Sequence, residues 1–213
     1  MSMLSRQSLS LSRCLVALLG ILASTAAWAH HPMGGETPAT YLQGMLSGLA
    51  HPVIGLEHLA FITAVGVMLG LGVLRRAIAP ALLIGAAVGG TTLNWLGTSV
   101  PMVELVVLLS VLGAAAVIWF EPAWRDLATG MAIPAAFCHG QAYGEAIIGA
   151  EPTPVGAYLL GFTIVQMALA GVAFGVTRWA LTRPAESTRQ FRRSASVAVG
   201  SLGVLSVVVA PLI

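Results

Sequence analysis

The sequence contains no lysine, and charged residues make up only 8% of its 213 residues. Ten arginines and eight acidic residues give a formal net charge of +2. This low density of charge excludes a nucleic-acid-binding surface, which requires clustered basic residues. The chain is instead 57% hydrophobic, with a mean hydropathy of +0.90, values outside the range of ordinary soluble domains. The composition therefore predicts a membrane protein.

The N-terminal segment has the features of a secretory signal. Arg6 and Arg13 supply positive charge, residues 14–23 form an apolar run, and Ala27-Trp28-Ala29 provides a small-residue cleavage site. We therefore expect residues 1–29 to be a cleavable signal peptide. The alternative is an uncleaved signal anchor, although an apolar run of about ten residues is short for a membrane span.

The sequence has only two cysteines, and Cys14 would leave with the signal peptide. The mature chain then holds Cys138 alone, which excludes an internal disulfide. A lone buried cysteine is commonly a small apolar packing residue. Because His139 follows it in the sequence, Cys138 is also a candidate neighbour of a metal site.

Residues 30–40 are polar and contain glycine and proline, so we expect a short extracytoplasmic arm. The paired imidazoles of His30 and His31 are candidates for accessory capture of a metal ion. The alternative is a flexible tail with no part in binding.

Residues 41–213 are predicted to form one all-α membrane domain. Apolar runs of about 20 residues, enough to cross a hydrocarbon core of ~30 Å, recur along this segment. The six predicted spans are residues 53–74, 77–96, 101–120, 127–148, 155–177 and 194–212. Residues 41–50 are too few to span, and Pro52 disfavours a helical conformation at His51, so a half-helix or re-entrant turn is expected before the first span.

The arginines predict the orientation of the domain. All eight that follow the signal segment fall in the connections after spans one, three and five, and the other connections have none. The positive-inside rule then places both mature termini on the extracytoplasmic side. Residues 181–193 would form the one sizeable cytoplasmic loop, and Trp95 and Tyr158 are expected near the outer membrane interface.

Glycines recur four residues apart within the predicted spans, a spacing that lets membrane helices approach closely. The pairs are Gly66 with Gly70, Gly85 with Gly89, Gly140 with Gly144, and Gly171 with Gly175. We expect these pairs to produce a compact bundle.

Two stretches place ionisable side chains within apolar segments. The first contains His51, Glu57 and His58, and the second contains His139 and Glu145. Burying such groups in a membrane is unfavourable without a partner, a cavity or a bound cation, so these residues are the first candidates for function. Counting ~1.5 Å per residue from the nearest arginines places His58 and His139 at similar depth, in the outer half of the membrane.

Other polar residues are candidate supports of this site: Asn94, Glu104, Cys138 and Tyr143. On a continuous helix His51 and His58 would share a face, as would His139 and Tyr143. For Tyr143 and Gln141, hydrogen bonds between packed helices are the leading interpretation.

The residue types indicate which ion such a site would take. Imidazole nitrogens with one or two carboxylates suit nickel, cobalt or zinc, whereas sodium and calcium prefer shells of oxygen atoms. For any single membrane histidine, an interhelical hydrogen bond is the alternative. Three histidines beside glutamates favour a divalent transition metal as a transported substrate, with no resident cofactor.

At these two stretches the chain resembles the HupE/UreJ family of hydrogenase and urease accessory proteins, regarded as nickel or cobalt permeases. The family's first motif, His-Pro-x-x-Gly-x-Asp-His, is matched, with Glu in place of Asp, by His51, Pro52, Gly55, Glu57 and His58. Its second, His-Gly-x-Ala-His-Gly, is matched by His139, Gly140, Ala142 and Gly144. Tyr143 stands where the second histidine of that motif is expected, which replaces an imidazole by a weaker phenol ligand.

The resemblance implies a permease, not an enzyme, that imports Ni²⁺ or Co²⁺ across the bacterial inner membrane for hydrogenase, urease or cobalamin metal centres. Its partners would be the metal ion, the lipid bilayer and either further copies of the chain or accessory metal-delivery proteins. No Gly-x-x-x-x-Gly-Lys-Ser/Thr motif occurs, so transport would be secondary or powered by a partner.

Two other classes of function stay open on the sequence. One is an intramembrane hydrolase in which the three histidines hold a catalytic zinc and Glu57 or Glu145 is the general base. The absence of a His-x-x-x-His spacing on one helix counts against it. The other is an accessory protein that binds metal without transporting it.

Overall fold

A computed structural model gives the fold and describes residues 36–120 and 124–209. These residues form seven α-helices and one short 3-10 helix, with no strand among them. The elements are α2 (Tyr41–Ile54), α3 (Leu56–Leu71), α4 (Ala79–Trp95), α5 (Val103–Phe120), α6 (Arg125–Gly144), η2 (Glu145–Ile147), α7 (Pro152–Ala180) and α8 (Ala185–Val209). The predicted all-α fold is thus confirmed for this part of the chain. The predicted signal peptide, His30 and His31 lie outside the described residues.

Each of the six predicted spans overlaps one of the helices α3 to α8 over most of its length. Within the described ranges, α5, α7 and α8 are each long and apolar enough to cross a membrane, and α2 with α3 adds a fourth if that bent pair is one span. The chain is therefore a multi-pass membrane protein by composition and helix length. The number six stays a prediction, since α4 has only 17 residues and α6 carries many polar side chains.

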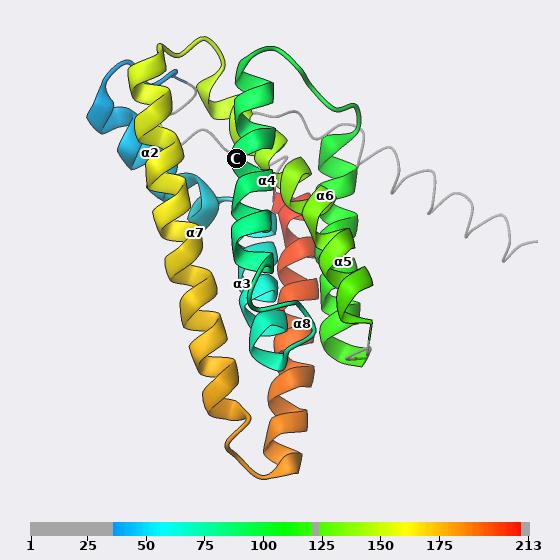
Figure 1. Cartoon of the computed structure of the whole chain (residues 1–213). Helices are drawn as coiled ribbons and strands as arrows, with labels where there is room; N and C mark the ends of the chain where they lie inside the picture. Colours follow the sequence, from blue (N-terminus) through cyan, green and yellow to red (C-terminus); the bar gives the residue numbers. More distant parts are fainter. Residues whose placement is uncertain (1–35, 121–123, 210–213) are drawn as a thin grey trace, which may run out of the picture.

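Helix α3 lies at the centre of the bundle. It packs against α2, α5, α7 and α8, and its buried residues occur on every side of the helix. A helix that is apolar all round is stable only when other helices surround it. In Figure 1, α7 runs the full height of the molecule and returns through a short connection into α8, while α4 lies in front of α3.

The helices that flank α3 pair through glycines. A Cβ atom on Gly140 would lie 2.1 Å from the carbonyl oxygen of Ala87, so the backbones of α6 and α4 touch. Of the four predicted pairs, Gly66 with Gly70 faces α7 and Gly140 with Gly144 faces α4. The other two pairs were wrong as contacts within the chain, because nothing lies within 4 Å of a Cβ built on Gly85, Gly89, Gly171 or Gly175.

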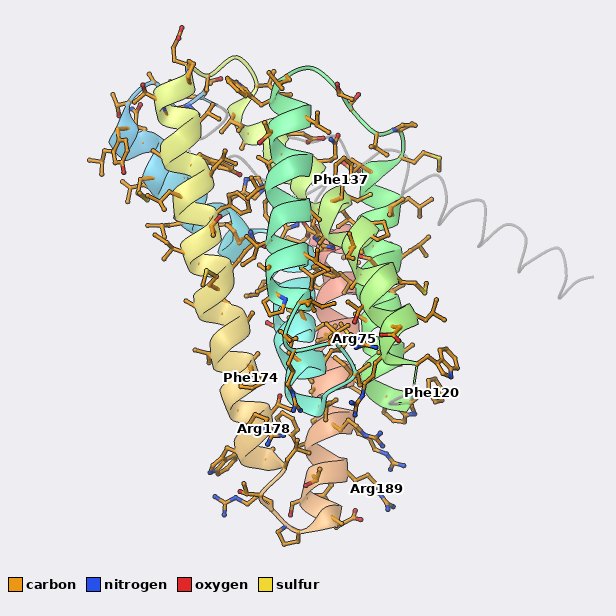
Figure 2. All side chains as sticks on the ribbon, in the orientation of Figure 1. Arg75, Phe120, Phe137, Phe174, Arg178 and Arg189 are labelled. Carbon is orange, nitrogen blue, oxygen red and sulfur yellow. The ribbon has the colours of Figure 1, made fainter. Side chains whose placement is uncertain are left out.

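The bundle has two ends of different chemistry, which we call the arginine half and the histidine half. The arginine half surrounds Arg75, Arg76, Arg125 and Arg178, and the histidine half surrounds His51, His58 and His139. Figure 2 shows Arg178 and Arg189 in the lower part of the molecule and Phe137, two residues before His139, in the upper part. Two buried apolar clusters fill the bundle, the larger one around α3 and α5, and the smaller one around Tyr143, Tyr158 and Phe162.

Connections in the arginine half are held by their charged side chains. The Arg75 guanidinium donates to both carboxylate oxygens of Asp126, at 2.9 Å for the contact between Nη2 and Oδ2. Arg76 donates to the carbonyl oxygens of Leu69 and Gly70, at 2.8 Å each. Because the last carbonyls of a helix have no intrahelical partner, Arg76 completes the end of α3.

The expected connection between the last two spans is corrected here. The predicted loop at 181–193 is mostly helical, because α8 begins at Ala185. Span prediction follows apolar residues, so it misses a polar helical extension that is exposed beyond the apolar run. Tyr158 is fully buried inside the bundle, because α2 packs over this face of α7, and its expected place near the outer membrane interface stays a prediction.

Candidate functional site

Three imidazoles from three helices meet in the histidine half. His51 comes from α2, His58 from α3 and His139 from α6, and each is only 1% exposed. The ring centroids of His51 and His58 are 5.4 Å apart, and those of His58 and His139 are 5.2 Å apart. The two sequence motifs therefore contribute to one histidine cluster, a point that their spacing left open.

A sharp bend at Gly55 sets the position of His58. Helices α2 and α3 meet there at 78°, so His51 and His58 are neighbours across a bend instead of along one helix face. A Cβ atom on Gly55 would lie 2.5 Å from Cδ2 of His58, so only glycine lets this ring fold back over the bend. The predicted break at His51-Pro52 was misplaced by three residues, because Pro52 is accommodated in the last turn of α2.

Close packing of α2 on α7 sets the position of His51. Cβ atoms on Gly44 and Gly48 would each lie 2.2 Å from carbonyl oxygens of α7, those of Pro154 and Tyr158. Thr40 and Gln43 form a capping box that starts α2 at Tyr41. His51 consequently reaches Tyr158, whose hydroxyl lies 3.1 Å from the imidazole Nδ1.

Packing of α6 on α4 sets the position of His139. Gln141, next but one in the sequence, donates to the carbonyl of Gly90 at 3.0 Å and accepts from the amide of Val100 at 3.2 Å. On the other side of the imidazole, the ring of Phe61 stacks at 4.1 Å with an interplanar angle of 16°. His139 is thus held in place from two helices.

The polar contacts of the cluster form a chain. Nδ1 of His58 lies 2.9 Å from Nδ1 of His139, and Nε2 of His58 lies 3.4 Å from Oε1 of Glu57. Nε2 of His139 lies 2.9 Å from the Oγ atom of Ser110 on α5. Glu57 is itself buried, so the carboxylate and the imidazoles share one enclosed environment.

Sequence reasoning missed Ser110 and the site role of Tyr158. Ser110 is the only hydroxyl-bearing residue in the apolar sequence of α5, which was a usable signal. Nothing in the sequence indicated a role of Tyr158 in the site, because a tyrosine near the end of a predicted span usually lies at a membrane interface.

The candidate supporting residues differ in their placement. Tyr143 lies against the cluster, with its ring 4.3 Å from that of His58 and 5.3 Å from that of His51. Asn94 is buried and donates to the side-chain oxygen of Gln141 at 3.5 Å, so its hydrogen bond is to a neighbour of His139 in the sequence and not to an imidazole.

The remaining candidates lie farther along the helices. Glu104 is in the first turn of α5, and Glu145, in η2, is half-buried and interacts electrostatically with Glu104. Cys138 is a buried free thiol. Within the part of the chain that is described, neither Glu145 nor Cys138 makes a hydrogen bond or ion pair with the three imidazoles.

The donor atoms do not converge on a single point in this conformation. Among the described residues, no group of three or more histidine, cysteine, aspartate or glutamate side chains is arranged to hold a metal ion. The cluster nevertheless presents the nitrogen and carboxylate donors that nickel, cobalt or zinc prefer.

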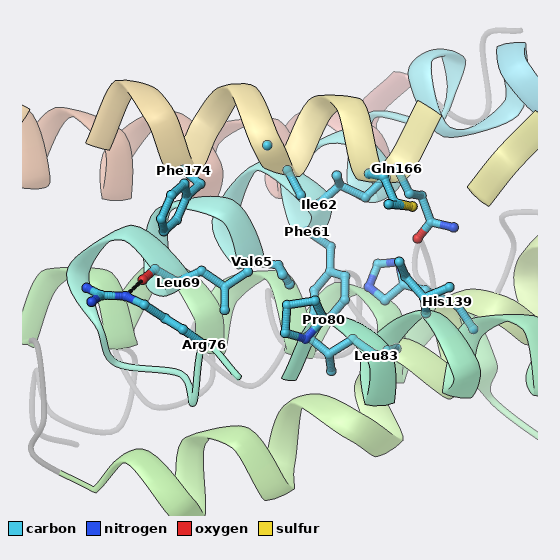
Figure 3. A pocket seen from close by; sticks show the side chains of 16 residues that line it. Phe61, Ile62, Val65, Leu69, Arg76, Pro80, Leu83, His139, Gln166 and Phe174 are labelled. Carbon is cyan, nitrogen blue, oxygen red and sulfur yellow. Dashed lines mark hydrogen bonds between the residues drawn. The ribbon is translucent and has the colours of Figure 1, made fainter. Parts of the chain in front are cut away.

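A cavity of about 330 Å³ runs from His139 toward Arg76. Figure 3 shows His139 and Gln166 at one end, Arg76 at the other, and Phe61, Val65 and Pro80 between them. The stacked Phe61 ring and the His139 imidazole both line it, so the cavity reaches the histidine cluster from the arginine half.

The fold and the cluster together define a class: an all-helical, multi-pass membrane protein with a buried imidazole and carboxylate site. A family model described as HupE / UreJ protein matches residues 16–206, and the chain therefore belongs to the HupE/UreJ family. Membership supports a role in metal transport or as a metal-related accessory protein. Searches of curated proteins and of solved structures found no match.

Proposed function

We propose that this protein is a permease that carries a divalent transition metal ion, nickel or cobalt, across the bacterial inner membrane into the cell. The observation that carries the proposal is the cluster of three buried histidines from three helices, with a buried glutamate beside one of them, inside a membrane helix bundle. Such groups are unfavourable in a membrane interior and mark ion pathways there.

The spacing of the central pair supports metal binding. Two nitrogens that bind one metal ion at about 2.1 Å and a right angle lie about 3.0 Å apart, as in square-planar or octahedral sites. The Nδ1 atoms of His58 and His139 are 2.9 Å apart, joined by a hydrogen bond, so both lone pairs can face one ion once the hydrogen of His58 moves to its Nε2. His51 or Glu57 then supplies a further donor, after rotation of its side chain, and Glu145, Glu104 and Tyr143 belong to the approach to the site.

The transport cycle that we propose starts with metal capture by His30 and His31 and transfer to the histidine cluster. Rocking of the helices then opens the site toward the cavity beside Phe61 and Phe174. The binding imidazoles must be neutral, so protons compete with the metal ion. We expect uptake to fall as the external pH drops, because protonated imidazoles cannot bind the ion.

The test is metal accumulation in a bacterial host that lacks its own nickel and cobalt transport. The wild type is compared with His58→Ala and His139→Ala at matched membrane expression, with Ser206→Ala as a control whose hydroxyl bonds within α8. We expect uptake of one metal, abolished by both histidine substitutions and retained by the control. A well-expressed wild type that accumulates neither metal would refute the proposal, and bound zinc in that purified protein would favour the hydrolase.

A further inference from the structure

Two hydroxyl groups contact the histidine cluster from outside, and each also contacts a backbone carbonyl. Ser110 Oγ lies 2.9 Å from Nε2 of His139 and 2.7 Å from the carbonyl oxygen of Val107. Tyr158 Oη lies 3.1 Å from Nδ1 of His51 and 2.9 Å from the carbonyl oxygen of Tyr143. The two arrangements are equivalent, although the hydroxyls belong to different helices.

The carbonyl contacts fix the direction of both hydrogen bonds. A hydroxyl has one hydrogen, and a carbonyl oxygen can only accept. At 2.7 Å and 2.9 Å, the hydroxyl hydrogens must therefore point at the carbonyls of Val107 and Tyr143. Each hydroxyl can then only accept from the imidazole beside it, so the facing ring nitrogen carries a hydrogen.

The consequence is a defined tautomer for each neutral ring. His139 carries its hydrogen on Nε2, which leaves the lone pair on Nδ1, the atom that faces His58 at 2.9 Å. His51 carries its hydrogen on Nδ1, which leaves the lone pair on Nε2. Metal ions bind the nitrogen with the lone pair, so the hydroxyls decide which atom of each ring is the donor.

We infer that Ser110 and Tyr158 are positioning residues, which hold His139 and His51 in opposite tautomers and so set the donor atoms of the metal site. The effect on metal affinity rests on the proposed function, whereas the tautomers do not. Groups that orient metal-binding histidines typically change affinity by about 10- to 100-fold when removed. Neither residue is required to touch the metal ion.

The first experiment measures Co²⁺ binding to the purified full-length protein by calorimetry in detergent. We expect Ser110→Ala to weaken binding by about 10- to 100-fold and Ser110→Thr to retain it, because a helical threonine can bond the same carbonyl. Ser206→Ala is the matched control, since the Ser206 hydroxyl also donates to the carbonyl three residues earlier, that of Gly203, at 2.9 Å.

Tyr158→Phe removes the second hydroxyl and keeps the buried ring. We expect a loss of Co²⁺ affinity in the same range, with Tyr41→Phe, at an exposed tyrosine, as its control. Thermal unfolding of each variant shows whether a loss of binding reflects a loss of folding.

A second readout needs no variant to bind metal. In the metal-free, ¹⁵N-histidine-labelled wild type, nitrogen chemical shifts should report hydrogen on Nε2 of His139 and on Nδ1 of His51. Ser110→Ala should change the shifts of His139 and of His58, which lies 2.9 Å from it, and leave those of His51 unchanged, whereas Tyr158→Phe should change those of His51.

The outcomes separate the two proposals. Wild-type protein that binds Co²⁺, with unchanged affinity in Ser110→Ala and Tyr158→Phe, overturns the inference and leaves the proposed function standing. If the wild-type protein neither binds nor transports metal, the proposed function is overturned. The nitrogen chemical shifts then test by themselves whether Ser110 and Tyr158 set the tautomers. Hydrogen on Nδ1 of His139 or on Nε2 of His51 would overturn the inference about Ser110 and Tyr158, whether or not the protein binds metal.

Discussion

The histidine half and the arginine half of the bundle bury different kinds of side chains. In the histidine half, His51, Glu57, His58, His139 and Gln141 are all buried and in polar contact with other groups. In the arginine half the interior is mainly apolar, its buried polar side chains include the hydroxyls of Thr129 and Thr177, and the charged pair Arg75–Asp126 is exposed. Ionisable groups are unfavourable in a membrane interior, so the buried histidines and Glu57 indicate where function is placed.

The backbone differs in the same way. Near the histidines the chain bends by 78° at Gly55 and tightens into the 3-10 helix η2. Toward the arginines α3, α5 and α8 are regular and pack side chain to side chain. Irregular backbone thus occurs where imidazoles from separate helices must meet, and substitutions should have larger effects there.

The largest effect on stability should come from Gly140→Ala. The added methyl group would lie 2.1 Å from the Ala87 carbonyl oxygen and force α4 and α6 apart. We expect a loss of about 1–3 kcal/mol, as for other overpacked interiors. Gly85→Ala, on the same α4 but with nothing within 4 Å, should be neutral or stabilising by up to about 1 kcal/mol. Thermal unfolding in detergent measures both, and equal melting temperatures would show that the α4–α6 contact is not tight.

The second prediction concerns Glu57→Gln, which keeps the shape of the side chain and removes its charge. The carboxylate lies 3.4 Å from Nε2 of His58, so we expect Co²⁺ uptake to fall about tenfold or more. Glu186→Gln removes a carboxylate in the arginine half, where Glu186 is exposed and 4.0 Å from Arg189. Co²⁺ uptake by Glu186→Gln should match that of the wild type. If uptake falls equally in both variants, the loss comes from the net charge of the protein and not from the contact between Glu57 and His58.

A smaller difference is expected between two phenylalanines that line the same cavity. Phe61→Leu and Phe174→Leu should each lower the free energy of unfolding by about 1 kcal/mol, since they change volume moderately. Only Phe61 stacks on His139, so only Phe61→Leu should also weaken Co²⁺ binding, by a few-fold. Calorimetry on the two variants tests this, and weaker binding in both would extend the site into the arginine half.

The smallest effect should come from Asp126→Asn at the exposed pair with Arg75. The hydrogen bond from Arg75 lowers the pKa of the Asp126 carboxyl. A lowered pKa stabilises the fold above the unfolded value of about 3.9, and the contribution is lost as pH falls through the folded value. Because water and salt screen this pair, the melting temperature at neutral pH should change less than in Gly140→Ala. A larger fall in melting temperature than in Gly140→Ala would show that the exposed Arg75–Asp126 pair contributes strongly to stability.

Much of the fold was readable from the sequence, because helix formation and membrane preference depend on local composition. Each of the six apolar runs overlaps one of the helices α3 to α8, and both motif stretches include buried residues. The similar depth expected for His58 and His139 agrees with their 2.9 Å contact. The errors occurred where local pattern is a weak guide: the bend falls at Gly55 instead of His51, and α8 starts at Ala185.

By itself, then, the sequence determined the helical class, the apolar segments and the residue types available for a metal site, since these follow from residues close together in the chain. Only the tertiary structure decided which of them meet. His58 and His139 are 81 positions apart, Tyr158 and His51 are 107 apart, and Ser110 reaches His139 across 29. Such contacts depend on helix order and on the bend at Gly55, and no periodicity along one helix encodes which neighbouring helix its side chains will face.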